Sequence, residues 1–406
     1  MPDRGPNAVS YNPLVDDTVS YIDRFQTFQM QLTASPSGTR PFSLTPTLTN
    51  TTLLSSGTPL TYGTGALGTG ASGGKSYMLG SGVPGLNAVN NSYYFTGRSD
   101  GFAAGTSSLN STAARLDPES IRVSTDGKTV FISDEYGPFV YQFDRATGQR
   151  IRSYALPSYY GVTDLSSQGN TEISGNTQGR LANKGMEGLA ITSDGKTLVG
   201  IMQSPLTQDG GANSKNIRIA TIDVSTGAVM HEYVYTLSDP NNTVSDITAV
   251  NDHQFLVDER DGKAGLAATT KQFFLIDVTN ATDVKGLSTL PRSFATVAKG
   301  ATPFIDMLDP AFGLNNANFP QKIEGAAFGE DVLVNGVLEH TLWISNDNDF
   351  ATDATSNFYV FGIACSDLPG FEAQQVAPEP SSYALLAAGL GVLAIIAGSR
   401  RAGLYS

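Results

Sequence analysis

One pattern occurs twice in the middle of the chain and limits the folds that the chain can adopt. Residues 119–134 and 187–203 each contain a glutamate, an apolar run, an Asp-Gly pair and a second apolar run, and the second copy starts 68 positions after the first. An Asp-Gly pair between apolar runs is the usual signal for a type I′ β-hairpin, in which both central residues have positive φ. We therefore expect two β-hairpins that begin at a glutamate and turn at Asp126-Gly127 and Asp194-Gly195.

The sequence after each hairpin also repeats, so the repeating unit is larger than a hairpin. Residues 140–154 and 217–235 each contain two further apolar segments joined by a Thr-Gly turn, which gives four antiparallel strands per unit. A third unit runs from Asp246 to Asp277, and a fourth runs from Glu324 to Phe361. Four-stranded sheets repeated at such a spacing are typical of a β-propeller. The alternative is a β-sandwich in which the spacing is a coincidence.

We predict an all-β fold in which residues 1–371 form a β-propeller of four-stranded antiparallel blades. The 43 glycines and 20 prolines among 406 residues indicate many turns and few long helices.

Residues 1–7 resemble the charged end of a strand, so we expect the first blade to be truncated. An exported protein should begin with a signal peptide that is first basic and then apolar. Residues 1–11 have neither feature, so we expect the coding sequence to continue upstream.

The composition narrows the kinds of partner and metal. The net charge of −13 opposes binding to nucleic acid and favours bound cations. Cys365 is the only cysteine, which excludes an intramolecular disulfide and a metal site built from several cysteines. With three histidines in the chain, zinc chemistry based on histidine is not expected either. A site for a cation with oxygen ligands fits this composition.

The C-terminal residues have the order of a sorting signal. Residues 383–399 are an almost uninterrupted apolar run, close to the shortest helix that spans a bilayer, although a buried core helix is the alternative. The basic tail, residues 400–406, should stay cytoplasmic with the body outside. Pro378-Glu379-Pro380 precedes the run, within a predicted linker of residues 372–382. This order resembles the PEP-CTERM signal of bacterial proteins that are processed by an exosortase. The resemblance implies an exported protein of the cell envelope or cell surface, anchored in the membrane by the C-terminal helix before processing.

Several predicted strands end in clusters of charged residues at equivalent places in the repeat. These ends are residues 132–138, 256–262 and 342–349, and residues 1–7 have a similar form. Carboxylate oxygens are the ligands that Ca²⁺ prefers. We therefore predict Ca²⁺ ligands at Asp134, Asp258, Asp347 and Asp349. The alternative is that Asp and Asn residues near turns cap the strands through their own hydrogen bonds.

The glutamates at which the hairpins begin form a second set of candidate metal ligands. They are Glu119, Glu187 and Glu324, with Asp246 at the corresponding place in the third unit. Lys184 and Lys322 stand two or three residues before such a glutamate. They are candidates for substrate binding, and the alternative is that they form structural ion pairs.

Two arginines and two glutamates at the strand ends are the candidates for catalysis. Arg4 and Arg260 can bind a phosphate group, because a guanidinium matches two phosphate oxygens at once. Glu259 and Glu135 are the candidates for orienting an attacking water molecule.

Six segments together resemble a known family, in the family's order and over nearly the whole body. They are residues 3–7, 134–138, 183–190, 202–206, 258–262, and 322–325 together with 346–350. These segments look like the phytase-like esterase domain of secreted bacterial proteins. The resemblance implies a propeller fold and hydrolysis of phosphate esters, with dependence on Ca²⁺ as in the β-propeller phytases.

From these observations we expect an exported, membrane-tethered hydrolase that acts on phosphate esters and uses Ca²⁺. Its expected partners are a small phosphorylated substrate and an exosortase-type processing enzyme. The alternative is a non-catalytic propeller, stabilised by Ca²⁺, that binds an extracellular polysaccharide or protein.

Overall fold

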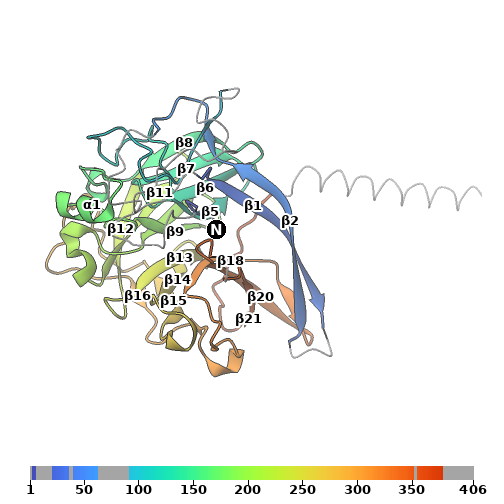
Figure 1. The fold of residues 1–406 in the computed structure, drawn as a ribbon. Helices are drawn as coiled ribbons and strands as arrows, with labels where there is room; N and C mark the ends of the chain where they lie inside the picture. Colours follow the sequence, from blue (N-terminus) through green and yellow to red (C-terminus); the bar gives the residue numbers. More distant parts are fainter. Residues whose placement is uncertain (1, 6–20, 36–39, 63–90, 352–353, 378–406) are drawn as a thin grey trace, which may run out of the picture.

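The computed structural model describes residues 2–5, 21–35, 40–62, 91–351 and 354–377. Within these ranges, β-sheets are arranged around a central axis, and the N-terminal residues lie at that centre (Figure 1). Four sheets follow one another around the axis in sequence order. The predicted β-propeller is confirmed, and the β-sandwich alternative is wrong.

Blades 1 and 2 correspond to the two copies of the repeat. Blade 1 consists of β5 (Pro118–Val123), β6 (Thr129–Asp134), β7 (Phe139–Asp144) and β8 (Gln149–Ala155). Blade 2 consists of β9 (Met186–Ile191), β10 (Thr197–Met202), β11 (Asn216–Asp223) and β12 (Val229–Thr236). In each blade the four strands pair antiparallel in sequence order. Blade 1 is extended at its outer edge by β3 (Ser55–Ser56), which is parallel to β8, and by β4 (Tyr93–Tyr94).

Blades 3 and 4 are less regular. Blade 3 consists of β13 (Thr243–Ala249), β14 (Gln254–Arg260) and β15 (Lys271–Asp277), with the two-residue strands β16 (Ala298–Lys299) and β17 (Ile305–Asp306) at its outer edge. Blade 4 consists of β18 (Lys322–Phe328), β19 (Val332–Val334), β20 (Val337–Asp347) and β21 (Phe358–Ala364). In blade 4 the long strand β20 pairs with β18 and β21, and also with β19.

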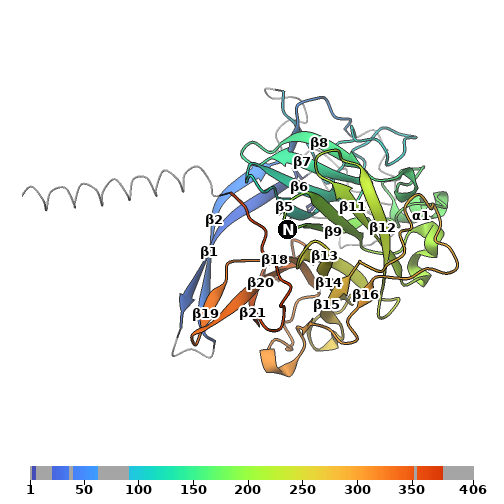
Figure 2. The same ribbon diagram turned by 180° about the vertical axis from the view of Figure 1, so that it is seen from behind.

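A long hairpin stands apart from the blades. It consists of β1 (Arg24–Ala34) and β2 (Phe42–Leu53), which pair antiparallel with each other in a two-stranded sheet. The hairpin extends beside blade 4, as Figures 1 and 2 show from opposite sides. The ring of Phe28 packs edge-on against Phe358 of β21, with 5.7 Å between ring centroids.

Helices in the described residues are short and lie in the connections between strands. The α-helix α1 spans Gly169–Gly175. The 3₁₀ turns are Ser158–Tyr160, Thr207–Asp209, Gly211–Asn213, Gly265–Ala267 and Pro310–Phe312.

Buried apolar side chains fill the spaces between neighbouring sheets. The largest cluster joins blades 1, 2 and 3, and includes Leu189 and Val257. A second cluster joins blades 3 and 4 around Leu256 and Leu342. Adjacent residues of one strand face opposite sides of its sheet, so Leu256 and Val257 belong to different clusters. Each large apolar side chain buried in this way contributes about 1.5–3 kcal/mol to folding.

The predicted hairpin turns are present, but they are not type I′. Gly127 and Gly195 have φ of +70° and +69°, whereas neither preceding aspartate is among the residues with positive φ. The Gly127 N–H donates to the Ser124 carbonyl, and the Ser124 N–H donates to the Thr129 carbonyl. Only the glycine therefore needs the left-handed conformation, because the hairpin loop is longer than two residues.

The chain beyond Phe371 is bound to the propeller, so residues 372–377 of the predicted linker are ordered against it. The Ala377 N–H donates to the Thr125 carbonyl at 2.7 Å, and Gln374 donates to the Val123 carbonyl at 2.9 Å.

Within the described ranges, none of the helices has the length and apolar character to cross a membrane. The Pro-Glu-Pro motif, the apolar run 383–399 and the basic tail lie outside the described residues.

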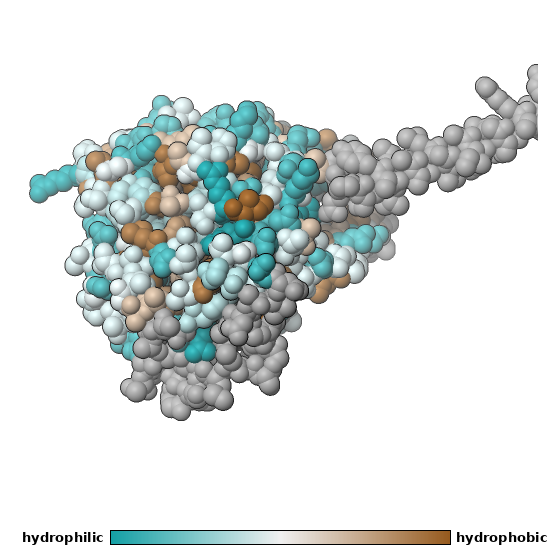
Figure 3. Space-filling model, turned by 90° about the horizontal axis from the view of Figure 1, so that it is seen from above, coloured by the Kyte–Doolittle hydropathy of each residue, from teal (hydrophilic) through white to brown (hydrophobic). Residues whose placement is uncertain are grey.

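The surface seen from above mixes hydrophilic and hydrophobic residues. Among the coloured residues of this view, the hydrophobic ones form small separate groups (Figure 3).

Candidate functional site

The register of the inner strands brings the predicted glutamates to the same level of the axis. Glu119, Glu187 and Glu324 each lie at an irregularity in the pairing of the inner strand, directly after the residue that forms the last regular pair. In blade 3 the pairs Val244↔Glu259 and Asp246↔Asp258 give this position to Ser245. The assignment of Asp246 to the third place in this ring is therefore wrong by one residue.

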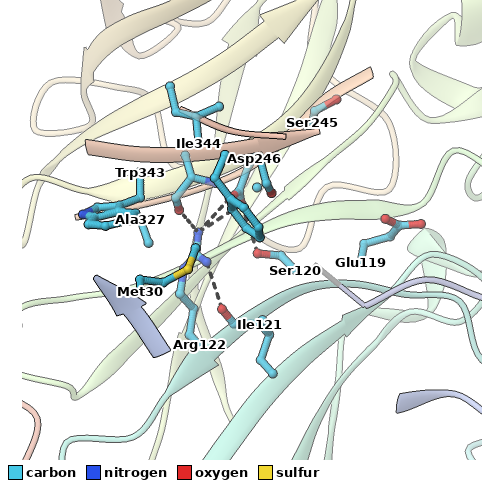
Figure 4. Close-up of a pocket in the computed structure, with 14 residues that line it drawn as sticks. Met30, Glu119, Ser120, Ile121, Arg122, Ser245, Asp246, Ala327, Trp343 and Ile344 are labelled. Atoms are coloured by element: carbon cyan, nitrogen blue, oxygen red, sulfur yellow. Dashed lines mark hydrogen bonds and ion pairs between the residues drawn. The ribbon is translucent and has the colours of Figure 1, made fainter. Parts of the chain in front are cut away.

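Asp246 instead lies between blades, where it is bound from several sides. It accepts hydrogen bonds from the Ser120 hydroxyl of blade 1 at 3.0 Å and from the Ala326 N–H of blade 4 at 2.6 Å. It also forms an ion pair with Arg122 at 3.0 Å. Figure 4 shows Arg122 and Asp246 facing each other in this way. Because these donors saturate the carboxylate, Asp246 joins blades 1, 3 and 4 and is not an available metal ligand.

Three carboxylates near the axis form the candidate metal centre, here called the acid cluster. Asp117, Glu119 and Glu135 each offer an oxygen, and the three oxygens lie within 4.8 Å of one another. The side chains of Asp117 and Glu135 are almost fully buried, with 1% of each residue exposed, and Glu119 is 9% exposed. Both oxygens of Asp117 and one of Glu135 accept no hydrogen bond within the described part of the chain.

Burial keeps these carboxyl groups protonated at pH values where a surface carboxyl is ionised. Burial raises the pKa of Asp117 to about 8, although the nearby Arg4 guanidinium opposes the shift. Burial, with repulsion from Glu187, also raises the pKa of Glu135 to about 8. The pKa of Glu119 is raised well above its usual value for the same two reasons. A bound cation would hold all three groups ionised, so the unpartnered oxygens fit a hard divalent cation.

Glu187 lies next to the acid cluster, and its pKa is also raised to about 8, by burial and then by the charge of Glu324. One of its oxygens has no hydrogen-bond partner among the described residues. Two of the predicted metal ligands, Glu119 and Glu187, thus lie near each other at the axis, where the charge of Glu187 helps to raise the pKa of Glu119.

Arg4 and Lys184 supply positive charge beside the acid cluster. The Arg4 guanidinium donates to the Tyr136 hydroxyl at 2.6 Å, and its Nε lies 3.7 Å from a carboxylate oxygen of Asp117. Lys184 donates to the Gln203 side chain at 3.3 Å. Burial lowers the pKa of Lys184, although the charges of Glu135 and Glu187 oppose this shift. Arg4, predicted to bind phosphate, and Lys184, predicted to bind substrate, therefore both lie near the acid cluster.

Arg260 is held by its neighbours in the interior. Its guanidinium forms an ion pair with Glu324, and its Nε donates to the Ser245 hydroxyl at 2.6 Å. Asp258, on the same face of β14, is fully buried, and neither of its oxygens accepts a hydrogen bond in the described ranges. Burial raises the pKa of Asp258 well above its usual value, although the Arg260 charge opposes this shift. Arg260 and Glu324 thus form a buried ion pair that compensates the charge at this level of the axis.

The acids at the end of β20 are paired with a lysine. Lys322 Nζ lies 3.0 Å from an Asp347 oxygen and 2.6 Å from an Asp349 oxygen. Asp349 is also about half exposed, with 48% of its side chain accessible. An ammonium group therefore occupies the position where we predicted Ca²⁺, which favours the structural ion pair that the sequence left open.

Asp134, another predicted metal ligand, is committed to structural hydrogen bonds. Asp134 accepts from the backbone N–H groups of Asp117 and Tyr136, at 3.2 and 2.9 Å. Burial raises the pKa of Asp134 to about 7. Asp134 thus fixes the backbone that carries the acid cluster.

Glu259 lies outside the acid cluster, because it projects from the face of β14 opposite to Asp258 and Arg260. Its donors, at 2.6–2.8 Å, are Tyr235, the Ser238 N–H, Asn242 and Lys299. Burial alone would raise the pKa of Glu259, but hydrogen bonds from Lys299 and Tyr235 hold it below its usual value. This saturated carboxylate does not fit the predicted role of orienting a water molecule.

Sequence reasoning missed two buried aspartates. Asp117 stands two positions before Glu119, a spacing that places two side chains on one face of a strand, and this signal could have identified it. Asp23 is fully buried, and neither of its oxygens accepts a hydrogen bond in the described residues. Burial, with repulsion from Asp117, raises the pKa of Asp23 well above its usual value. Nothing in its local sequence indicates this position.

A cavity of about 280 Å³ lies between blades 1 and 4. Figure 4 shows Arg122 and Asp246 in it, with Met30, Trp343 and Ile344 around them. Glu119 also lines the cavity, so the cavity extends to the level of the acid cluster.

Comparisons with known proteins agree with both resemblances noted in the sequence. The family described as "Phytase-like: Esterase-like activity of phytase" matches residues 10–350. The PEP-CTERM protein-sorting motif matches residues 376–401, which assigns the chain to exported proteins with this signal. A protein described as an uncharacterized secreted protein of Arthroderma benhamiae is 28% identical over 90% of this chain and 77% of its own length.

The chain also resembles solved structures. The β-propeller domain of Swd1 from Myceliophteria thermophila is 13% identical, with a TM-score of 0.26, over 56% of this chain and 52% of that chain. An ancestral GH74 enzyme is 11% identical, with a TM-score of 0.32, over 71% of this chain and 29% of that chain. This chain thus spans about half or less of the length of these two solved proteins.

Proposed function

The chain belongs to the phytase-like family, and from this membership and the acid cluster we propose that it hydrolyses phosphate esters with Ca²⁺ as its cofactor. One observation carries the proposal. Three buried carboxylates converge at the axis, and oxygens of two of them have no hydrogen-bond partner within the described residues. Such an arrangement is costly unless a cation or protons neutralise it.

Each residue of the proposed site has a distinct task. Asp117, Glu119 and Glu135 would hold the cation, which when bound neutralises and polarises a phosphoryl group. Arg4 and Lys184 would bind the phosphate oxygens beside it. Glu135 would also orient the attacking water and accept its proton, because the cation would keep this carboxylate ionised. Glu259 has no role in the proposed site, because its carboxylate is saturated by donors outside the acid cluster.

The experiment is a screen of phosphate monoesters and diesters with the full chain, with and without a chelator. We expect hydrolysis that the chelator abolishes and added Ca²⁺ restores. Glu135→Gln should lower kcat by about 100-fold, the contribution of a typical general base. Asp194→Asn, at the opposite end of blade 2, is the matched control and should leave the rate unchanged.

A second candidate function is favoured by the burial of the acid cluster. With Asp117 and Glu135 each 1% exposed, a cation held there could be purely structural, in a propeller that binds an extracellular polysaccharide or protein. In that case the chelator lowers the melting temperature and no hydrolysis of any ester is found.

We propose in addition that the apolar run 383–399 holds the exported protein in the membrane until the sorting signal is processed. Membrane fractionation of cells with and without the processing enzyme tests this point. Recovery of the unprocessed full chain in the soluble fraction would contradict it.

A further inference from the structure

The end of the described chain crosses the propeller on one face. This face, here called the turn face, consists of the hairpin turns at residues 124–128, 192–196 and 250–253. Residues 368–377, here called the strap, run over it from blade 4. The ring of Phe371 packs on Phe328 and His340 of blade 4, with 4.4 Å between centroids in each case.

The strap then contacts the other three blades in turn. The Glu372 N–H donates to the Val250 carbonyl of blade 3 at 2.8 Å, and the Ser193 hydroxyl of blade 2 donates to the Glu372 carboxylate at 3.1 Å. The strap reaches blade 1 through Gln374 and Ala377, by the hydrogen bonds to Val123 and Thr125. A single segment of ten residues therefore touches all four blades.

The turn face lies opposite the acid cluster. Glu119 is near the start of β5, and Thr125 is in the turn that follows β5. Six residues of extended chain separate these two levels by about 20 Å. The described chain therefore ends, at Ala377, on the face that does not carry the candidate site.

Chain length restricts where the sorting motif can be. Pro378 directly follows Ala377, whose N–H donates to the Thr125 carbonyl of the turn face. At no more than about 3.6 Å per residue, Pro380 lies within about 11 Å of this contact and Tyr383 within about 22 Å. A processing enzyme that encloses the Pro-Glu-Pro motif must therefore act within this short length of chain from a folded blade.

We propose that the turn face is the surface directed toward the membrane and the processing enzyme, and that the end of the strap must leave blade 1 before the motif is processed. The partner is a membrane-embedded enzyme that binds an extended Pro-Glu-Pro segment. The enzyme and the turn face compete for the same few residues, so the hydrogen bonds of Gln374 and Ala377 slow processing. This inference depends on the sorting motif and is independent of the proposed hydrolysis.

The test compares two glutamine substitutions in the strap by pulse-chase labelling of the full chain in a host with the processing enzyme. Gln374→Ala removes the hydrogen bond to Val123 and should speed processing about fivefold, the usual effect of one hydrogen bond on such an equilibrium. Gln375→Ala is the matched control, because Gln375 is exposed and its side chain donates within the strap, to the Ala373 carbonyl. Its processing rate should equal that of the unaltered chain.

A second variant separates a local effect from loss of folding. Ten Gly and Ser residues inserted after Ala377 leave every strap contact in place and free the motif. The insertion should speed processing, and Gln374→Ala should then add nothing. Equal rates for Gln374→Ala and the control, or an insertion that leaves the rate unchanged, would overturn the proposal.

Discussion

The two ends of the blades carry the same acidic residue types in opposite electrostatic states. At the end near the N-terminus, burial raises the pKa of Asp117 and Glu135 to about 8. At the turn face, Asp126 accepts hydrogen bonds from the Ser124 hydroxyl and the Lys128 N–H, and these lower its pKa. The Asp126 side chain is exposed, whereas those of Asp117 and Glu135 are buried.

This difference separates two uses of an aspartate at a strand end. At the turn face, the local backbone and solvent satisfy the carboxylate, so its charge costs little and stabilises the turn. In the acid cluster, burial removes the solvent and no local donor replaces it, so the charge requires a cation or a proton. The number of donors around a carboxylate therefore distinguishes the candidate site from a structural cap.

The largest expected effect is a dependence of stability on pH, to which the acid cluster and Glu187 contribute together with the other buried acids near the axis. Asp117, Glu135 and Glu187 have folded-state pKa values of about 8, against about 4 when unfolded. The folded state therefore binds more protons in this window, and the contribution of these groups to stability falls as pH rises from about 4 to about 8. Urea unfolding at pH 5 and pH 8 in chelator should give a lower free energy of unfolding at pH 8.

Added Ca²⁺ should remove most of this loss, because it binds the ionised carboxylates of the folded state. Glu135→Gln should make the pH dependence in chelator less steep. A free energy of unfolding that rises from pH 5 to pH 8 in chelator would contradict the assigned pKa shifts.

The next largest effect concerns ion pairs at the two ends. Arg260→Ala leaves Glu324 buried without its cation, which should lower the free energy of unfolding by about 3–5 kcal/mol. Lys196→Ala removes the partner of Asp194 at the turn face, where 79% of the lysine side chain is exposed, and should cost less than about 1 kcal/mol. Guanidinium unfolding of both variants measures the comparison, and equal losses would remove the distinction between the ends.

The smallest effect is expected for Asp194→Asn. The Thr192 hydroxyl and the Lys196 N–H donate to one Asp194 oxygen, at 2.7 and 3.0 Å, and an asparagine side chain retains this acceptor. The free energy of unfolding should change by less than about 0.5 kcal/mol. A loss above about 2 kcal/mol would show that the charge at the turn face is as important as the charge near the axis.

The repeat allowed much of the fold to be predicted from the sequence. The 68-residue spacing and the two Asp-Gly pairs located β5–β6 and β9–β10, and the apolar runs located the long strands of the four blades, whereas the short strands β3, β4, β16, β17 and β19 were not predicted. These signals are local, because side-chain alternation and turn chemistry depend on residues close in sequence. The order of sheets around the axis then followed from the order of the repeats.

The function of each charged residue could not be read in the same way. Glu259 and Arg260 are neighbours in sequence, yet Glu259 meets four donors on one face of β14 and Arg260 meets Glu324 on the other. The place expected for Asp246 is likewise taken by Ser245, because the pairing of β13 with β14 is irregular at this point. Residue spacing in the sequence does not predict such one-residue differences, because they depend on the register of strand pairing.

The sequence by itself determined that the chain forms repeated four-stranded sheets, that acids gather at strand ends, and that a sorting motif follows the body. Only the tertiary structure decided which acids lack donors among the described residues, that Asp117 and Asp23 are among them, and that the strap binds the turn face. The physical reason is that the charge state of a carboxylate depends on the groups that surround it in space. In a propeller those groups come from blades that are far apart in the sequence.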